Sequence, residues 1–238
     1  LLLAGPIERA EHLLPQLEKE HSFNCDRAIE GAKLIAWGYF KKIAIADVVV
    51  SLVDVVYDNV TVYTGLALGV ATFFYAFQVY CDFSGYSDIA RGVAKLLDIE
   101  LMTNFKSPYF AASLKEFWSR WHISLSTWFR NYVYIPLGGS RRGEWRTQRN
   151  LLITFLVSGL WHGASWTYVI WGGLHGLGQI VEKMWNRRFP PKKERRSVIR
   201  VLIVFCFVCV AWIFFRASTF SDAVYVLTHL FEGVGNPV

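Results

Sequence analysis

The sequence predicts an all-α fold, a polytopic transmembrane helix bundle with broken or re-entrant helices and interfacial amphipathic helices. Of its 238 residues, 53% are hydrophobic and 18% are charged, with a mean hydropathy of +0.29. Soluble domains carry about 25% charged residues. Aromatic residues make up 16%, as expected near membrane interfaces. Two stretches, 59–81 and 150–181, contain no charge, and about 20 mainly apolar residues suffice for a helix to cross the hydrocarbon core.

The composition and motifs exclude several classes of protein. High hydrophobicity excludes a disordered chain, and four cysteines are too few for a disulfide framework. The sequence has no P-loop, dinucleotide fingerprint or serine elbow. The net charge of +6 is concentrated in two basic clusters, 141–149 and 183–200. Such clusters fit nucleic-acid binding or loops beside membrane spans. Apolar segments border both clusters, which favours the membrane, so no nucleic-acid partner is expected.

The first half contains one partly polar helical segment and one expected span. Residues 31–57 are apolar but interrupted by lysine and aspartate, which predicts an amphipathic or partly buried helix. The uncharged run 59–81 predicts a membrane span. We interpret 82–88 as the end of that span, with Ser84 or Ser87 as the N-cap of a following helix. Asp82 is then either a functional carboxylate or a capping residue, and the turn-like sequence favours capping.

An interfacial helix is predicted after Ser113, because Ser113 and Glu116 form a capping-box pattern. Large side chains then recur at helical spacing on one face, while polar side chains occupy the opposite face. The apolar face comprises Trp118, Trp121, His122, Leu125, Trp128 and Phe129. The polar face comprises Glu116, Arg120, Ser124, Thr127 and Asn131. The pattern predicts one continuous amphipathic helix.

The run 150–181 is too long for one straight span, since 32 residues of helix extend about 48 Å against a core of about 30 Å. Its six glycines favour a broken or paired arrangement of two short helices. A further span is predicted at 201–215, beginning near Val198, after a loop marked by Pro190-Pro191. The chain opens on Leu1-Leu2-Leu3 and ends without a recognisable tail. We therefore expect residues 1–238 to be one partial transmembrane domain from within a longer protein.

Three histidines, His122, His162 and His175, lie in apolar surroundings. Ionisable groups at membrane depth are costly and often functional, but a neutral histidine can also serve packing. Glycines beside His162 allow close approach of a substrate, and both interpretations remain open for it. For His175 the sequence favours helix packing through small residues. No carboxylate lies at ligand spacing, so no metal site is expected. A redox role for the apolar Cys206–Cys209 pair is not expected either.

Several motifs together resemble one known family. Arg120-Trp121-His122-Ile123-Ser124-Leu125-Ser126-Thr127-Trp128, followed by Arg130-Asn131-Tyr132-Val133-Tyr134-Ile135-Pro136-Leu137-Gly138-Gly139, resembles the signature of membrane-bound O-acyltransferases. Within these, the chain is most similar to the bacterial alginate O-acetylation branch. Similar motifs in the same order are Ala4-Gly5-Pro6-Ile7-Glu8-Arg9, Asp82-Phe83-Ser84-Gly85-Tyr86-Ser87-Asp88, Leu160-Trp161-His162-Gly163 and Trp171-Gly172-Gly173-Leu174-His175-Gly176.

The resemblance implies a multi-pass protein of the bacterial inner membrane whose catalytic centre lies inside the bundle, reached by funnels from both faces. His162 and His122 would be its two active-site histidines. The side chains expected to shape the substrate-binding part are Trp121, Trp161, Asn131, Tyr132 and Asp82.

The implied activity is that of an acyltransferase for groups other than amino-acyl groups. It would take an acetyl group from acetyl-CoA, a substrate rather than a bound cofactor, for an extracytoplasmic polysaccharide such as alginate. An extracytoplasmic acetyltransferase would be a partner, and the lipid bilayer surrounds the protein. Two alternatives stay open: D-alanyl transfer from a carrier protein to teichoic acid, and a non-enzymatic transporter or export scaffold in which buried histidines relay protons.

Overall fold

The computed structural model describes residues 5–190 and 197–233, which are helices joined by loops with no strand among them. The all-α prediction is confirmed for these residues. Leu1-Leu2-Leu3, Ala4, Pro191, the basic residues within 191–196 and the end at Val238 lie outside them. The α-helices are α1 (Ala10–Leu17), α2 (Cys25–Tyr39), α3 (Asp47–Tyr57), α4 (Leu66–Leu96), α5 (Leu114–Trp118), α6 (Ile123–Phe129), α7 (Glu144–His162), α8 (Trp166–Arg188), α9 (Val198–Arg216) and α10 (Phe220–His229). Two π-helices, η1 (Phe40–Ala46) and η4 (Arg130–Tyr134), and two 3₁₀ turns, η2 (Val60–Val62) and η3 (Pro108–Phe110), complete them.

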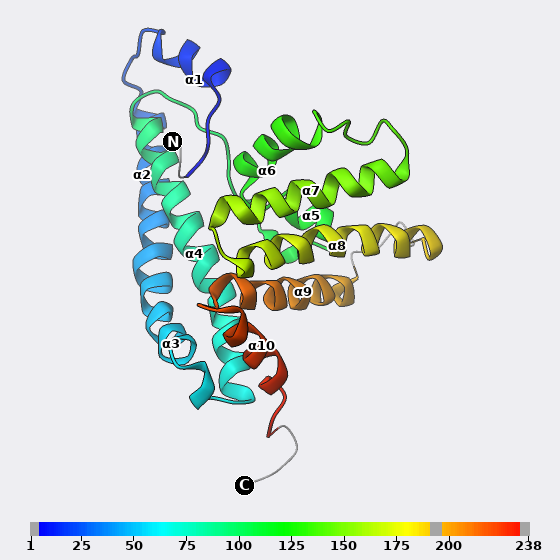
Figure 1. The fold of residues 1–238 in the computed structure, drawn as a ribbon. Helices are drawn as coiled ribbons and strands as arrows, with labels where there is room; N and C mark the ends of the chain where they lie inside the picture. Colours follow the sequence, from blue (N-terminus) through cyan, green and yellow to red (C-terminus); the bar gives the residue numbers. More distant parts are fainter. Residues whose placement is uncertain (1–4, 191–196, 234–238) are drawn as a thin grey trace.

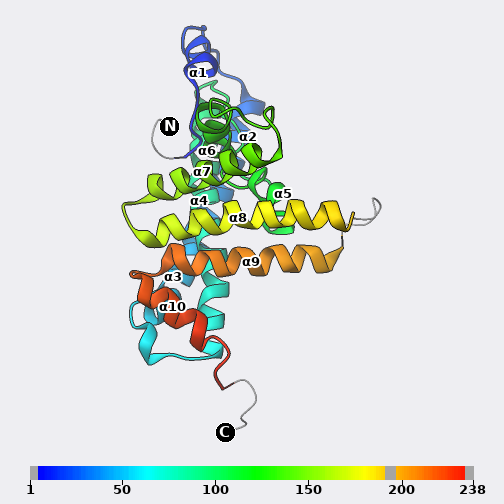
Figure 2. The ribbon, with the colours of Figure 1, turned by 45° about the vertical axis from the view of Figure 1, so that its right-hand side comes forward.

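Two groups of helices cross each other. Helices α2 and α3, joined by η1, run antiparallel to the long α4, whereas α7, α8 and α9 lie crosswise to that pair in both views (Figures 1 and 2). The core forms where the groups meet and is largely aromatic. Its largest fully buried side chains include Trp171, Trp212 and Phe117. Buried aromatic surface of this kind contributes much of the packing free energy.

Helices α2 and α4 approach closely because glycines face each other. A Cβ atom on Gly38 would lie 2.6 Å from the carbonyl oxygen of Gly85, and one on Gly92 would lie 2.5 Å from that of Gly31. No real side chain fits such distances. The prediction of a partly buried helix at 31–57 is confirmed, with η1 as an irregular turn within it.

The expected break at 82–88 is wrong, because α4 continues through this segment. The polar side chains find partners on the neighbouring helix instead of capping a new one. Lys41 of η1 donates to Ser84 at 3.0 Å and pairs with Asp88 at 2.7 Å. Because the side chains of Ser84 and Asp88 bind Lys41, they do not cap a new helix, and α4 continues through this segment.

The single helix predicted from Ser113 is also wrong. Its start is correct, since the Ser113 hydroxyl accepts from the Glu116 amide at 3.0 Å. However, α5 ends at Trp118, and α6 begins only after His122, which has φ 43° and ψ 56°. This left-handed residue turns the chain, so the predicted face is divided. Trp121 becomes buried, whereas Trp128 stays 38% exposed.

The uncharged run 150–181 forms two helices, α7 and α8, as predicted. The chain reverses at Gly163–Ser165, and Ser165 caps α8 by accepting from the Thr167 amide. The two helices pack closely, since a Cβ on Gly172 would lie 2.2 Å from the Phe155 carbonyl oxygen.

Two helices of the described ranges are long and apolar enough to cross a membrane, α4 with mean hydropathy 1.4 and α9 with 2.8 over their most apolar windows. The predicted span at 201–215 lies within α9. The one at 59–81 overlaps α4, whose helix begins later, at Leu66. Further crossings, re-entrant segments and interfacial placement remain predictions.

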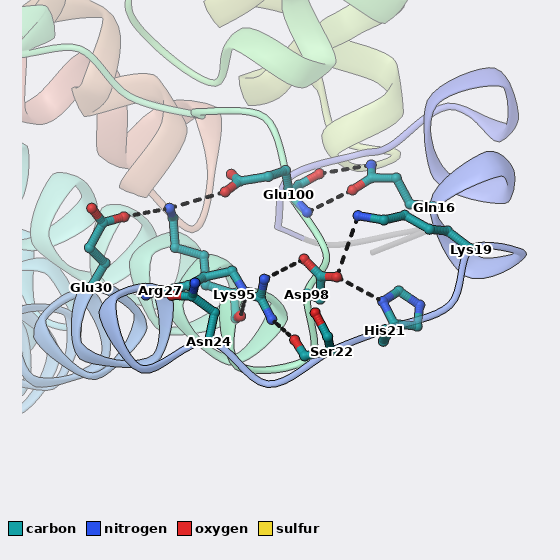
Figure 3. Close-up of polar contacts among 10 residues, drawn as sticks. All are labelled: Gln16, Lys19, His21, Ser22, Asn24, Arg27, Glu30, Lys95, Asp98 and Glu100. Carbon is teal, nitrogen blue, oxygen red and sulfur yellow. Dashed lines mark hydrogen bonds and ion pairs between the residues drawn. The ribbon is translucent and has the colours of Figure 1, made fainter.

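The N-terminal segment is anchored to the end of α4 by a polar cluster (Figure 3). Asp98, just after α4, pairs with Arg27 at 2.7 Å and with Lys19 at 3.5 Å. Lys95 pairs with Glu30 and Glu100 at 2.9 and 3.0 Å. These contacts attach the segment after α1 and the start of α2 to the end of α4.

Candidate active site

His122 is a buried imidazole with one free nitrogen. Its side chain sits immediately before α6, the residue is 5% exposed, and its ring meets the Phe83 ring of α4 edge-on at 4.6 Å. The ring is hydrogen-bonded to the backbone of Gly5, while Nε2 has no partner. We assign this bond to Nδ1–H, because the buried Nε2 makes no hydrogen bond. In a neutral ring this leaves the Nε2 lone pair available to accept a proton.

Burial is the main electrostatic influence on His122, which lies outside α4 and α9. The pKa of the imidazole falls from 6.5 to about 3, mainly because of burial and to a smaller extent because of the nearby His162, while the Gly5 carbonyl acts in the opposite direction. Removal from water disfavours the charged ring. His122 is thus neutral at physiological pH, the protonation state that a general base requires.

His162, the last residue of α7, is only half-buried. Its ring lies edge-on to Trp171 at 5.1 Å and to Phe215 at 5.2 Å. Gly163 makes this arrangement possible, because a Cβ there would lie 2.6 Å from the Tyr168 ring. Among the described residues the His162 ring has no hydrogen-bond partner. It is therefore the more accessible of the two histidines.

The two imidazoles belong to one aromatic region. His162 is close enough for its charge to influence His122. Ring contacts also join them through the core: from His162 to Phe215 and Trp212 on α9, then to Trp121, and from there to Phe105 and Phe83 beside His122. Such surroundings limit the access of water to the buried His122 ring.

His175 serves packing, as the sequence favoured. It is fully buried in α8 and stacks on Phe117. Trp118 donates its indole N–H to Nδ1 at 3.2 Å, which occupies the lone pair and leaves the proton on Nε2. With that tautomer the ring has no free base nitrogen.

Of the predicted substrate-binding residues, Trp161 touches a candidate catalytic histidine, whereas Trp121 does not. Trp161 is 47% exposed and meets the His162 ring at 4.9 Å. Trp121 is buried in the core between Phe105 and Trp212, and contacts neither histidine ring directly in the described contacts.

The other three predicted residues lie further out. Asn131, with its carboxamide oxygen toward Arg9, accepts two hydrogen bonds at 2.6 and 2.8 Å. Tyr132 is 56% exposed and packs on Trp128. Asp82 pairs with Lys42 at 2.7 Å, so it is neither a cap nor a neighbour of the histidines in these contacts. The capping interpretation of Asp82 is wrong, because the ion pair to η1 replaces it.

Sequence reasoning missed residues that surround the histidines through long-range contacts. Gly5, Phe83 and Phe215 touch the imidazoles. Asn104 holds the backbone after His122, and its carbonyl accepts from the Ile123 amide at 3.0 Å. No local spacing marks these residues. The family-like motifs that include Gly5 and Phe83 drew attention to their segments, but not to these contacts.

In the described residues, the candidate active site is marked neither by a cluster of metal ligands nor by a cavity lined by its histidines. No three His, Cys, Asp or Glu side chains of the described ranges lie close enough to hold a metal. A cavity of about 660 Å³ is lined by Lys106, Ser107, Phe110, Ser119 and Arg120. Neither histidine lines it, so the free imidazole nitrogens are the feature that identifies the site.

Comparison with known proteins agrees with these observations. Residues 1–220 match the model of the membrane-bound O-acyltransferase family. A peptidoglycan O-acetyltransferase of Helicobacter pylori is 39% identical over 95% of this chain and 44% of its own length. A probable alginate O-acetylase AlgI of Pseudomonas putida is 40% identical over 97% and 47%. A teichoic acid D-alanyltransferase of Bacillus subtilis is 31% identical over 64% and 42%.

The chain spans less than half the length of these curated relatives. The family model nevertheless covers nearly all of it, including both histidine motifs. On this match, the chain belongs to the membrane-bound O-acyltransferase family.

Proposed function

We propose that the protein containing this chain transfers an acetyl group from acetyl-CoA for O-acetylation of an extracytoplasmic polysaccharide. The observation that carries the proposal is the buried, neutral His122 with an unpartnered Nε2, within electrostatic range of the accessible His162. A hydroxyl is a weak nucleophile, and a neutral imidazole within hydrogen-bond reach can take its proton during attack. Family membership makes acyl transfer the reaction to which we assign these groups.

In this reaction His162 is the base, since its ring is the more accessible one. As an imidazole nitrogen accepts the hydroxyl proton, the acceptor oxygen forms a bond to the thioester carbonyl carbon. The carbon–sulfur bond then breaks, and the imidazolium returns the proton to the leaving thiolate. His122 acts as a second base or as the group that orients the acceptor. General-base assistance of this kind accounts for a factor of about 10²–10⁴ in rate.

The surrounding rings have a supporting role in this proposal. Trp161, Trp171 and Phe215 lie against His162. A site lined by aromatic rings limits hydrolysis of the thioester, because water is excluded. Asn131, Tyr132, Trp121 and Asp82 are assigned to the wider binding region and its shape, not to contact with the reacting atoms.

The setting is proposed as well. We place the protein in the bacterial inner membrane as a multi-pass protein, with residues 1–238 as part of one transmembrane domain. Alginate is the first acceptor to test, because relatives at about 40% identity are named alginate O-acetylases. An extracytoplasmic acetyltransferase would pass the group to the polymer.

The experiment uses the full-length protein in membranes and compares His162→Ala, His122→Ala and the exposed-site control His21→Ala. We expect each active-site variant to lower acetyl-CoA consumption and polymer acetylation by about 10²–10⁴-fold, with the control within about twofold of wild type. Insertion and protein amount are measured in parallel. Wild-type rates in His162→Ala would disprove its role as base.

The second candidate is D-alanyl transfer to teichoic acid, favoured by the relative named for that activity. A D-alanyl thioester on a carrier protein, offered in place of acetyl-CoA, distinguishes the two. A transporter or export scaffold would move ions or polymer without consuming either thioester.

A further inference from the structure

Asn104 links three parts of the molecule around His122. It lies in the loop after α4 and is 1% exposed. Its carbonyl oxygen accepts from the Ile123 amide at 3.0 Å, and its Oδ1 accepts from the Ser124 amide at 3.2 Å and hydroxyl at 2.9 Å. Its Nδ2 donates to the Ser87 hydroxyl of α4 at 3.3 Å. Each of these bonds therefore ends on α4 or on one of the two residues that follow His122.

His122 needs such support because its backbone is unusual. Its φ of 43° is left-handed, a conformation that non-glycine residues rarely adopt. Residues in sparsely populated conformations persist only when their surroundings hold them, and they gather at functional sites. The hydrogen bonds from Asn104 hold the chain directly after the strained residue.

One turn of α4 serves as the common frame for these contacts. Phe83 packs edge-on against the His122 ring, and Ser87 anchors Asn104. Tyr86 packs against Gly5, whose carbonyl binds the His122 ring. Contacts to the backbone after His122 and contacts to its ring thus both depend on this one turn of α4.

We propose that Asn104 is a positioning residue, which acts through His122 by fixing the left-handed backbone that aims the imidazole. This inference rests on the proposed acyl-transfer function. Asn104 does not touch the reacting groups. Its loss would release residues 122–124 and displace the ring, and displacement of a catalytic group by about 1 Å can reduce the rate by about 10²-fold.

The chain offers a matched control in Asn150. This asparagine is also fully buried, and its Nδ2 holds the carbonyl oxygens of Leu137 and Gly139 at 3.0 and 3.1 Å. It lies twelve residues before His162 on α7, about 18 Å along the helix axis. Asn150→Ala therefore removes a comparable loop anchor without releasing His122.

The test measures kcat, KM for acetyl-CoA and thermal stability of the full-length protein carrying Asn104→Ala or Asn150→Ala. We expect similar losses of stability from both. Asn104→Ala should lower kcat by about 10- to 100-fold with KM within about twofold, whereas Asn150→Ala should keep kcat per folded molecule within about threefold. Equal effects of both variants on kcat would show that Asn104 is only structural and overturn the proposal.

His122→Ala and the double variant separate this inference from the function on which it rests. If His122→Ala keeps wild-type kcat, the proposed role of His122 fails. If His122→Ala loses activity but Asn104→Ala does not, only the positioning role fails.

The double variant tests whether the two residues act together. A residual rate in His122→Ala should not fall further when Asn104→Ala is added, because Asn104 would act only through His122. A further fall in the double variant, in proportion to the Asn104→Ala effect, would contradict the proposal.

If Asn104→Ala does not accumulate, Ser124→Ala provides the test. It removes the 2.9 Å bond to Oδ1 while leaving Asn104 in place. We expect kcat to fall by about three- to tenfold, at unchanged KM. Wild-type kcat in that variant would then count against the proposal.

Discussion

The buried histidines His122 and His175 differ in their hydrogen-bond partners, and therefore in whether a ring nitrogen can accept a proton. In His122 the bond to the Gly5 carbonyl is assigned to Nδ1, which leaves the unpartnered Nε2 with its lone pair. In His175 the same atom accepts from the Trp118 indole, so the ring is left with a proton on its unpartnered Nε2. Burial alone does not separate these residues, since both are buried. The partner at Nδ1 decides which of them can act as a base.

The low pKa of His122 predicts a pH-dependent contribution to stability. The folded ring has a pKa of about 3 against 6.5 when exposed, so the unfolded chain binds the proton more tightly. Acidification below pH 6.5 therefore destabilises the folded protein. Between pH 7.5 and 5.0 the loss is about 2 kcal/mol, from about 1.4 kcal/mol per pH unit.

His122→Asn is the matched variant, because asparagine tolerates a left-handed backbone and does not titrate. Thermal unfolding of both proteins in detergent is compared across that pH range. We expect the wild type to lose stability relative to the variant as the pH falls. A constant difference between them would mean that His122 is not held neutral by burial.

At the scale of elements, close backbone contacts determine how the helices pair. Gly31 and Gly38 of α2 meet Gly92 and Gly85 of α4, and in the α7–α8 hairpin Gly172 meets the Phe155 carbonyl. Close approach brings polar groups within reach of each other, as in the ion pair of the buried Lys41 with the partly buried Asp88. In a lipid surrounding, small residues at helix interfaces allow the van der Waals contact that drives association.

Gly38→Ala should destabilise the α2–α4 pair. The added Cβ would lie 2.6 Å from the Gly85 carbonyl oxygen and 2.9 Å from the Ile89 amide nitrogen, and neither backbone atom can rotate away. Overpacking of this kind costs about 1–3 kcal/mol. The measurement is thermal unfolding in detergent.

Gly69→Ala, also on α4, is the control. Its Cβ would meet only a Leu230 methyl group at 3.9 Å, an ordinary contact. Alanine is the better helix former by about 1 kcal/mol, so this variant should be neutral or more stable. The interpretation of the α2–α4 interface would be wrong if both variants behaved alike.

At the scale of the whole molecule, α4 and α9 are the described helices suited to crossing a membrane, yet they cross each other at a large angle (Figures 1 and 2). The exposed face of α9 is apolar and carries Leu202, Ile203, Cys206 and Val210. Exposed apolar side chains on such a helix are expected to contact lipid. Cys25, by contrast, is exposed at the start of α2.

These positions predict different thiol reactivity in open membrane fragments of the full-length protein, using variants that keep one cysteine each. Cys25 should react with a charged, membrane-impermeant maleimide. Cys206 should resist that reagent but react with a lipid-soluble maleimide, because hydrocarbon excludes the charged one. Rapid labelling of Cys206 by the charged reagent would show that this face of α9 meets water.

Properties that depend on local sequence were predictable. Apolar runs and periodicity predicted the helices and the reversal between α7 and α8, and the histidine motifs indicated the family. The errors occur where distant groups overrule a local signal. Ser84 and Ser87 resembled caps, but Lys41 and Asn104 satisfy them within a continuous α4. The continuous helix predicted after Ser113 is broken at His122. Asn104 forms hydrogen bonds with the next two residues, Ile123 and Ser124.

The sequence by itself determined the all-helical class, the family and the residue type at each candidate catalytic position, because these depend on composition, spacing and motif. Only the tertiary structure decided which nitrogen of His122 is free, which histidine is left to packing and which residues hold the site together. The physical reason is that hydrogen-bond partners such as Gly5 and His122, or Asn104 and Ser124, are brought together by folding and leave no trace in local spacing.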